Sequence, residues 1–433
     1  MAEQLILKNL PFIKILPSWA QELSYKYCSQ TANLYAVHGN IRDFLPHKME
    51  ENVFNFVKIQ DYIADVLFGN RDIIVFYDRS SGVSFCNNEM KSDYLGVMRS
   101  RNGGAGEEDY LSTEPYKAFK NLESYFYASI PSNKRIVLII DYAETLIPNT
   151  DLSRYSEEER FCLVTFNRWA NDPIFTQGDV SIILLTENLA DLSARIVRSP
   201  STIKVTIPIP DEKVRESFLN FLNGQEKILL EPGLSTKEVA KITGGLNLVN
   251  LNQLVAESYQ EGRTLSLDYL RKKKKELIEA EAIGLLEFIE CEHDLSMVSG
   301  HDFVKKRFKN ATRAIKQGRL DVLPMGYLIS GPVGTGKSFM VTAFAGEIGI
   351  PIVKFRNFRS KWQGVTDANL EKILSICKAM APVGVMIDEA DAFLGNRNQE
   401  GDSGTSNRIC LLYTSRAHET VLDLVCRLLL EKK

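Results

Sequence analysis

The chain has 433 residues, of which 44% are hydrophobic and 25% are charged. This composition is that of a globular protein and excludes a largely disordered chain, while the length is sufficient for two or three domains. A net charge of −3 provides no surplus of Lys and Arg for general binding to nucleic acid or acidic membranes, so we expect neither as a partner.

Residues 1–30 are expected to form an N-terminal helical segment, with no targeting or membrane signal. Charged residues and prolines interrupt the apolar stretch Met1–Gln21, and no apolar run in the chain reaches the length of about 20 residues that a membrane helix needs. The seven cysteines include no Cys-x-x-Cys pair, which argues against a zinc site or a disulfide framework and favours a reducing compartment. The sequence therefore predicts a cytoplasmic protein.

Residues 31–208 have the pattern of an α/β domain, in which apolar strands alternate with helical stretches. Three such strands are predicted, at 72–77, 135–140 and 180–186. The second of these strands ends in Asp141, and the third is followed by Asn188.

Helical patterns dominate the next part of the chain. Residues 209–262 are expected to form a small helical domain, and residues 263–300 a helical linker between two halves of the chain. The linker contains the basic run Arg271–Lys275, which we interpret as a solvated helix face in preference to a nucleic-acid contact.

A phosphate-binding loop is predicted within residues 301–409. Residues 326–338 read GYLISGPVGTGKS, an apolar strand followed by the pattern G-x-x-x-x-G-K-[ST] and then a helical stretch. Glycines allow successive backbone N–H groups to surround phosphate oxygens, and the following helix presents its positive N-terminal end to the same anion. Lys337 is expected to reach the outer phosphates and Ser338 to ligate Mg²⁺. The predicted nucleotide-binding residues are Gly331, Pro332, Val333, Gly334, Thr335, Gly336, Lys337 and Ser338.

Two acids after a later strand are predicted to complete this site. Residues 383–391 read VGVMIDEAD, an apolar strand that ends in Asp388 and Glu389. At the carboxyl end of a strand Asp388 can hold the Mg²⁺ shell, while Glu389 can accept a proton from an attacking water. The predicted catalytic residues are thus Lys337, Asp388 and Glu389, and the predicted metal ligands are Ser338 and Asp388.

Between the two motifs lies the segment Phe358–Leu374, which reads FRSKWQGVTDANLEKIL. Trp362 and Gly364 place an aromatic ring on a glycine-flanked loop before a helix, where it can press against an extended peptide without reading its sequence. A core position is the alternative for Trp362. With these motifs the sequence resembles the AAA+ ATPases, in particular the classical AAA branch, in which such a loop faces the pore of a ring. Gln363 departs from the hydrophobic residue that is usual there.

Two further stretches, Met297–Phe308 and Gly401–Arg408, are similar to segments that flank these motifs in the family. The resemblance implies an α/β P-loop NTPase fold, a three-layer αβα arrangement with a parallel sheet, plus a small helical lid domain after the first module. It also implies ATP and Mg²⁺ as cofactors, ATPase activity and self-assembly into a ring, expected to be a hexamer. The expected task is the remodelling of a protein substrate. A nucleotide-gated binding scaffold with little turnover and a nucleic-acid loader stay open as alternatives.

The first half is similar to the second but lacks its nucleotide chemistry. The strand that ends in Asp141 matches the one that ends in Asp388, and Tyr142 stands in place of the general base; a phenol with a pKa near 10 is a poor base at neutral pH. The missing phosphate loop is expected at Asp78–Phe85, which has one glycine and no Gly-Lys-Ser. Asn188 lies near the position of the family's polar sensor. We therefore expect a degenerate AAA module, with the helical region after it as its lid. An unrelated α/β domain is the alternative.

The resemblance ends after Arg408, where the family continues with an apolar helix, a strand ending in Asn, an arginine finger and a lid. In residues 410–433 the pieces CLLYTS, RAHET and DLVCRLLLEKK instead back-translate, in one reading frame, into a transposase adapter used for sequencing libraries. We therefore expect a translated adapter after a second module that is truncated at 409, and little ATPase activity from the chain as written. A true amphipathic helix is the alternative, because apolar residues recur there at helical spacing.

Overall fold

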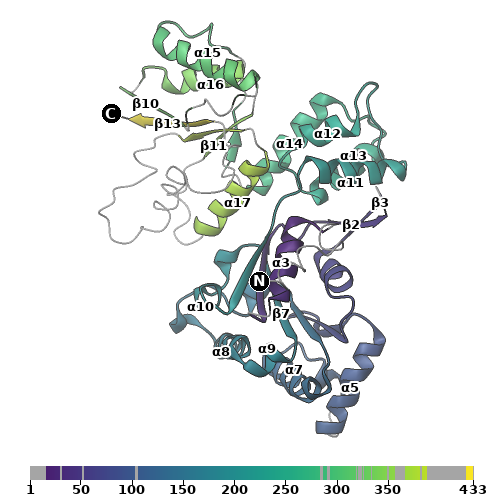
Figure 1. Ribbon diagram of the computed structural model, residues 1–433. Helices are drawn as coiled ribbons and strands as arrows, with labels where there is room; N and C mark the ends of the chain where they lie inside the picture. Colours follow the sequence, from purple (N-terminus) through teal and green to yellow (C-terminus); the bar gives the residue numbers. More distant parts are fainter. Residues whose placement is uncertain are drawn as a thin grey trace. The chain divides into compact units, whose positions relative to one another are not determined.

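The computed structural model describes residues 16–29, 32–50, 53–102, 106–282, 286–289, 293–317, 319, 324, 326–332, 334–348, 351–355, 366–380, 383–387 and 426–432. The chain divides into two compact units, Met1–Pro208 and Ile209–Lys433 (Figure 1).

The first unit is built on a six-stranded sheet in the order β5-β4-β6-β7-β1-β8. All neighbouring strands are parallel except β5, which pairs antiparallel with β4 at one edge. The strands are β1 (Leu34–Gly39), β4 (Ile73–Asp78), β5 (Gly82–Phe85), β6 (Ile136–Ile140), β7 (Val180–Thr186) and β8 (Thr202–Ile207). A separate antiparallel pair consists of β2 (Leu45–Glu50) and β3 (Val53–Val57).

Helices cover both faces of this sheet, so the first unit has three layers. Alternate residues of β1 divide between two cores: Leu34 and Ala36 face one, Tyr35 and Val37 the other. A strand that is buried on both faces is apolar throughout, as parallel strands of this kind are. The helical segments are α3 (Ser18–Cys28), α4 (Ile59–Asp61), η1 (Tyr62–Leu67), α5 (Asn88–Asn102), α6 (Glu107–Tyr110), α7 (Pro115–Ser129), η2 (Ile130–Ser132), η3 (Ala143–Thr145), η4 (Leu152–Arg154), α8 (Glu157–Asn171), α9 (Pro173–Gln177), η5 (Leu189–Asp191) and α10 (Ala194–Val197).

The second unit begins with a helical domain. Its helices are α11 (Glu212–Gly224), α12 (Thr236–Ile242), α13 (Leu248–Gln260) and α14 (Leu267–Glu281). The first three lie in the region predicted to be a lid. The fourth, predicted as a linker, packs on the same domain: Lys274 Nζ donates to the carbonyl of Ile242 at 2.9 Å, and Asn250 Nδ2 donates to Glu281 Oε2 at 2.9 Å. Leu270 and Ile278 of α14 are fully buried there, because this helix carries an apolar stripe as well as its basic run.

The helical domain is followed by a five-stranded sheet in the order β10-β13-β12-β11-β9. Its elements are β9 (Leu286–Phe288), α15 (Asp302–Lys316), β10 (Tyr327–Gly331), α16 (Lys337–Ile348), β11 (Ile352–Phe355), α17 (Thr366–Ala379), β12 (Gly384–Ile387) and β13 (Cys426–Lys432). The sheet is parallel except for β9, which pairs antiparallel with β11. On one side α15 packs against α16, where the rings of Phe308 and Phe344 stack with centroids 4.1 Å apart.

The strand β13 belongs to the segment that the sequence assigns to a translated adapter and leaves out of the fold. In the structure, Cys426–Lys432 instead forms a parallel strand between β10 and β12. Three consecutive leucines, Leu428–Leu430, give this segment the continuous apolar run that a central parallel strand needs. Strand, and not the alternative amphipathic helix, is therefore the conformation of these residues.

Strand order corrects the position expected for the lost phosphate loop of the first module. The strand that precedes Asp141, β6, has β4 beside it, and β4 carries the antiparallel edge strand β5. In the second module β12 likewise has β11 beside it, and β11 carries the antiparallel strand β9. Thus β4 corresponds to β11, and the counterpart of β10 is β1. The expectation that the lost phosphate loop lies at Asp78–Phe85 is wrong, because these residues end β4 and form the turn and the strand β5.

Candidate nucleotide sites

The second module places its glycine-rich loop between β10 and the first residue of α16. Gly334 and Gly336 have φ of +84° and +78°, in the left-handed region that favours glycine. The space around both is open, so backbone conformation is the reason for these two glycines. Gly334, Thr335 and Gly336 are exposed, and α16 begins at Lys337, with the amide of Met340 bonded to the carbonyl of Gly336 at 2.9 Å.

The side chains of this loop are held by its own backbone. Lys337 Nζ donates to the carbonyls of Gly331 at 2.6 Å and Pro332 at 2.8 Å. Thr335 Oγ1 donates to the same Pro332 carbonyl at 2.8 Å. Ser338, in the first turn of α16, is exposed. The ammonium group thus lies against the mouth of a loop whose residues Gly334–Gly336 are exposed, which is an arrangement suited to an anion.

The acids predicted for this site follow β12 directly in the chain. Strand β12 ends at Ile387, the residue before Asp388. The predicted site residues that lie outside the described residues are Val333, Trp362, Gly364, Asp388 and Glu389.

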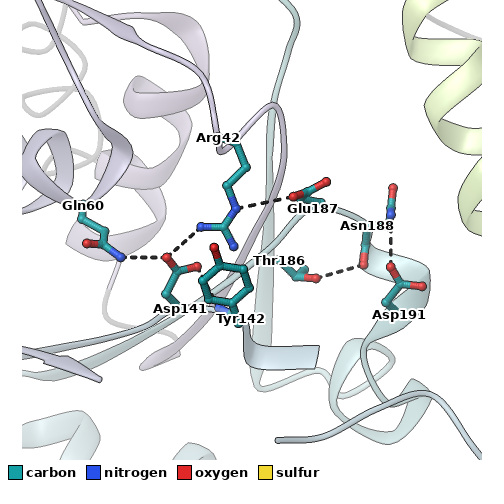
Figure 2. A network of polar contacts seen from close by, with 8 residues as sticks. All are labelled: Arg42, Gln60, Asp141, Tyr142, Thr186, Glu187, Asn188 and Asp191. Carbon is teal, nitrogen blue, oxygen red and sulfur yellow. Dashed lines mark hydrogen bonds and ion pairs between the residues drawn. The ribbon is translucent and has the colours of Figure 1, made fainter. Parts of the chain in front are cut away.

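In the first module an arginine lies where the phosphate loop would be. Arg42, just after β1, donates from Nη1 to Asp141 Oδ2 at 2.7 Å, and its Nε lies 3.5 Å from Glu187 Oε1 (Figure 2). Gln60 Nε2 of α4 donates to the same oxygen of Asp141 at 2.7 Å. The amide of Tyr142 donates to Asp141 Oδ1 at 2.7 Å. Both oxygens of this carboxylate therefore have partners within the chain.

The ring of Tyr142 packs on the same arginine. The Cζ atom of Arg42 lies 3.9 Å from the centroid of the Tyr142 ring, a cation–π contact. Tyr142 is 48% exposed and has φ of +50°, an uncommon conformation for a bulky residue. Asn188, expected near the sensor position, donates from Nδ2 to Asp191 Oδ2 at 3.1 Å. The residue at the end of β7 that reaches the arginine is Glu187.

Electrostatics keep this cluster charged. Burial disfavours the guanidinium cation, but the hydrogen bond and charge of Asp141 outweigh burial and raise the pKa of Arg42 above its usual value. The side chain of Asp141 is 8% exposed, so the guanidinium is the countercharge that makes its burial tolerable. We name Arg42, Gln60, Asp141, Tyr142 and Glu187 the Arg42 cluster.

Sequence reasoning found Asp141 and Tyr142 but missed Arg42, Gln60 and Glu187. A possible signal was the pair His38-Gly39 at the end of an apolar stretch, which marks a strand end and a turn. The pairing of Arg42 with Asp141 spans much of the first module and depends on strand order, which periodicity does not provide.

None of the described helices has the length and apolar character to cross a membrane. In the same part of the chain, no three His, Cys, Asp or Glu side chains are grouped so as to hold a metal ion.

Three known family models match successive parts of the chain. Residues 10–208 match the N-terminal Rossmann-like domain of AAA+ chaperones, and residues 213–283 match their second helical domain. Residues 327–421 match the AAA domain of ATPases associated with various cellular activities. The helical match ends after α14, in agreement with the packing of that helix. The mostly parallel sheets flanked by helices confirm the expected P-loop NTPase fold.

Individual relatives are distant and longer than this chain. The chain is 26% identical over 226 residues to the uncharacterized AAA domain-containing protein ycf46 of Trieres chinensis, covering 50% of this chain and 44% of the relative. It is 28% identical over 251 residues to an ATPase family protein 2 homolog of Caenorhabditis elegans, covering 54% of this chain and 33% of the relative. For a cell division cycle protein 48 homolog of Archaeoglobus fulgidus the identity is 23% over 309 residues, covering 64% and 41%.

In each case the match spans less than half the length of the relative. The three family matches nevertheless follow one another along the chain in the order of the structural domains, with the phosphate loop inside the third. The chain belongs to the AAA+ ATPases.

Proposed function

We propose that the second module binds ATP at Gly331–Ser338 and hydrolyses it with the help of Asp388 and Glu389. The observation that carries this proposal is the loop between β10 and α16, with two left-handed glycines and Lys337 at its mouth. Such a backbone directs amides toward one point, and the N-terminus of α16 adds partial positive charge there. These features fit the phosphate groups of a nucleotide.

Each residue has a definite role in this proposal. The ammonium of Lys337 has three N–H donors, and two of them bond backbone carbonyls. The third donor can bond an outer phosphate. Ser338 and Asp388 would hold Mg²⁺, which when bound neutralises charge on the phosphates. Glu389 would accept a proton from the attacking water. Because the carboxyl ends of parallel strands share one edge of a sheet, residues that follow β12 are expected on the side of the loop that follows β10.

The wider role that we propose is protein remodelling by a ring of these chains, with a hexamer as the expected assembly. The match to chaperone domains over 10–208 and 213–283 supports it. Trp362 and Gly364 would form the loop that grips an extended protein substrate.

A second candidate is a nucleotide-gated scaffold, and the Arg42 cluster favours it. A first module whose acid is already paired with an arginine has no evident use for nucleotide, but it can hold a partner while ATP controls assembly through the second module.

Binding of a fluorescent ATP analogue tests the site itself. Lys337→Ala should weaken binding about 10- to 100-fold, since a charge-assisted hydrogen bond to phosphate is lost. Lys378→Ala, an exposed lysine of α17, is the matched control and should leave binding unchanged. Equal affinity of the wild-type chain and Lys337→Ala would rule out the proposed site.

Glu389→Gln and Trp362→Ala separate motor from scaffold in a protein with a complete second module. If the protein is a motor, Glu389→Gln should bind ATP yet stop remodelling, and Trp362→Ala should bind ATP normally but remodel nothing. A scaffold should retain its partner with Glu389→Gln. If both Glu389→Gln and Trp362→Ala still remodel the substrate, the protein is not a motor.

A further inference from the structure

The Arg42 cluster joins three strand ends of the first module and a helix. Arg42 follows β1, Asp141 follows β6 and Glu187 follows β7, while Gln60 belongs to α4. In the corresponding arrangement of the second module, the phosphate loop follows β10 and the predicted metal-shell acid follows β12. The guanidinium of Arg42 therefore lies between the end of β1 and Asp141. In the second module the equivalent place is where the metal and phosphate would bind.

Three successive backbone amides at the end of β1 also have hydrogen-bond partners. The amide of Gly39 donates to the carbonyl of Glu187 at 3.0 Å, that of Asn40 to Ile207 at 2.9 Å and that of Ile41 to Gly39 at 2.8 Å. Gly39 has φ of +99°, and a Cβ there would lie 2.5 Å from the carbonyl oxygen of Ile207. Three successive amides are thus bonded to backbone carbonyls, and none of them points to an anion site.

Both oxygens of the Asp141 carboxylate have hydrogen-bond partners without a ligand. Asp141 accepts from Arg42, from Gln60 and from the amide of Tyr142. The positive charge of Arg42 also lies beside Glu187 and over the ring of Tyr142. A metal ion would have to displace a half-buried ion pair, and a phosphate at the loop would also have to displace three backbone hydrogen bonds.

We propose that Arg42 is a built-in substitute for the metal and phosphate in the first module: it cross-links the ends of β1, β6 and β7, so that this module keeps its conformation in every nucleotide state. Each chain then takes up one nucleotide, at the second module. This role concerns the first module alone and does not depend on ATP hydrolysis by the second.

The test uses the full chain with a reporter confined to the first module. The chain has three tryptophans, of which Trp19 and Trp169 are buried in the first module. In a host chain that carries Trp362→Phe, thermal melting followed by tryptophan fluorescence reports only that module. Lys337→Ala is added to the host so that nucleotide binding at the second module does not contribute.

Arg42→Met in this host should lower the fluorescence melting temperature by about 5 °C or more, because it leaves the buried carboxylate of Asp141 without its countercharge. The matched control is Arg79→Met, which removes an ion pair of the same module whose carboxylate, Glu158, is 46% exposed; its melting temperature should fall by less than about 2 °C. Arg42→Lys should recover part of the loss, because it keeps the charge.

The host itself should melt at the same temperature with and without millimolar Mg²⁺-ATP. In Arg42→Met, adding Asp141→Asn should lower the melting temperature by less than the sum of the two single changes, because the two groups act on each other. A rise of the host's melting temperature with Mg²⁺-ATP would overturn the proposal, since it would show a nucleotide in the first module. Equal losses for Arg42→Met and Arg79→Met would overturn it too. Absence of ATP hydrolysis by the second module would change neither result.

Discussion

Lys274 shows how one residue couples the stability of the helical domain to pH. Its ammonium donates to the carbonyl of Ile242, at the C-terminal end of α12, where positive charge is favourable. Burial, with a smaller contribution from the charge of Arg215, nevertheless lowers the pKa of Lys274 to about 8 from its ordinary 10.5. The unfolded chain therefore holds this proton more tightly than the folded chain.

We predict that the free energy of unfolding of this domain rises as pH increases from about 8 to 10.5, because over that range the unfolded state binds more protons. The expected gain is about 2 kcal/mol, which allows for the partial exposure of the side chain. Chemical denaturation followed by circular dichroism at several pH values measures it.

Lys274→Met should remove this pH dependence, whereas the exposed neighbour Lys272→Met should keep it. If wild type and Lys274→Met share the same slope of stability against pH, the lysine is not the group responsible.

At the scale of elements, the sequence was informative where a motif fixes local geometry. The strand, glycine-rich loop and helix at 326–348 lie where predicted, because the loop's conformation depends on residues close together in the chain. The first module has no such motif. The sequence predicts that the apolar stretch 72–77 is the strand before the lost loop, but β1 corresponds to that strand, as only the sheet order reveals. The Arg42 to Asp141 pair was missed for the same reason.

A glycine-to-alanine substitution should accordingly destabilise the first module at the end of β1 but not within a helix. Gly39→Ala should lower the free energy of unfolding of the first module by about 2 kcal/mol or more, since its φ is +99° and the added Cβ would collide with the carbonyl of Ile207. Gly96→Ala is the same substitution within α5, where the space around the glycine is open. It should raise that free energy by up to about 1 kcal/mol, because alanine favours helix.

Tryptophan fluorescence of the Trp362→Phe chain, with urea as denaturant, measures both changes in the first module. Changes of the same sign and size at Gly39 and Gly96 would mean that the backbone at the end of β1 is not constrained as described.

At the scale of the whole molecule, each of the two sheets has a strand at the same position. In the first module β7 lies between β6 and β1, after a connection of residues 141–179. In the second, β13 lies between β12 and β10, after a connection of residues 388–425. An apolar run at this chain distance is sufficient to fill the position, so a translated adapter that contains Leu428–Leu430 can form this strand. The AAA family match extends to residue 421, which is 12 residues beyond the end expected from the sequence at residue 409, and it stops before β13.

We therefore predict that a long read of the gene from its source DNA diverges from the present sequence between the codons for Asn407 and Leu412. The true frame should continue with an apolar helix, a strand ending in Asn and a downstream Arg, and the protein made from it should hydrolyse ATP. The 433-residue chain should hydrolyse little, because a strand of foreign sequence supplies neither the polar side chain at the γ-phosphate nor the arginine for a neighbouring subunit. If CLLYTSRAHET is encoded in the source DNA, β13 is the natural strand. In that case the scaffold becomes the better account of the protein.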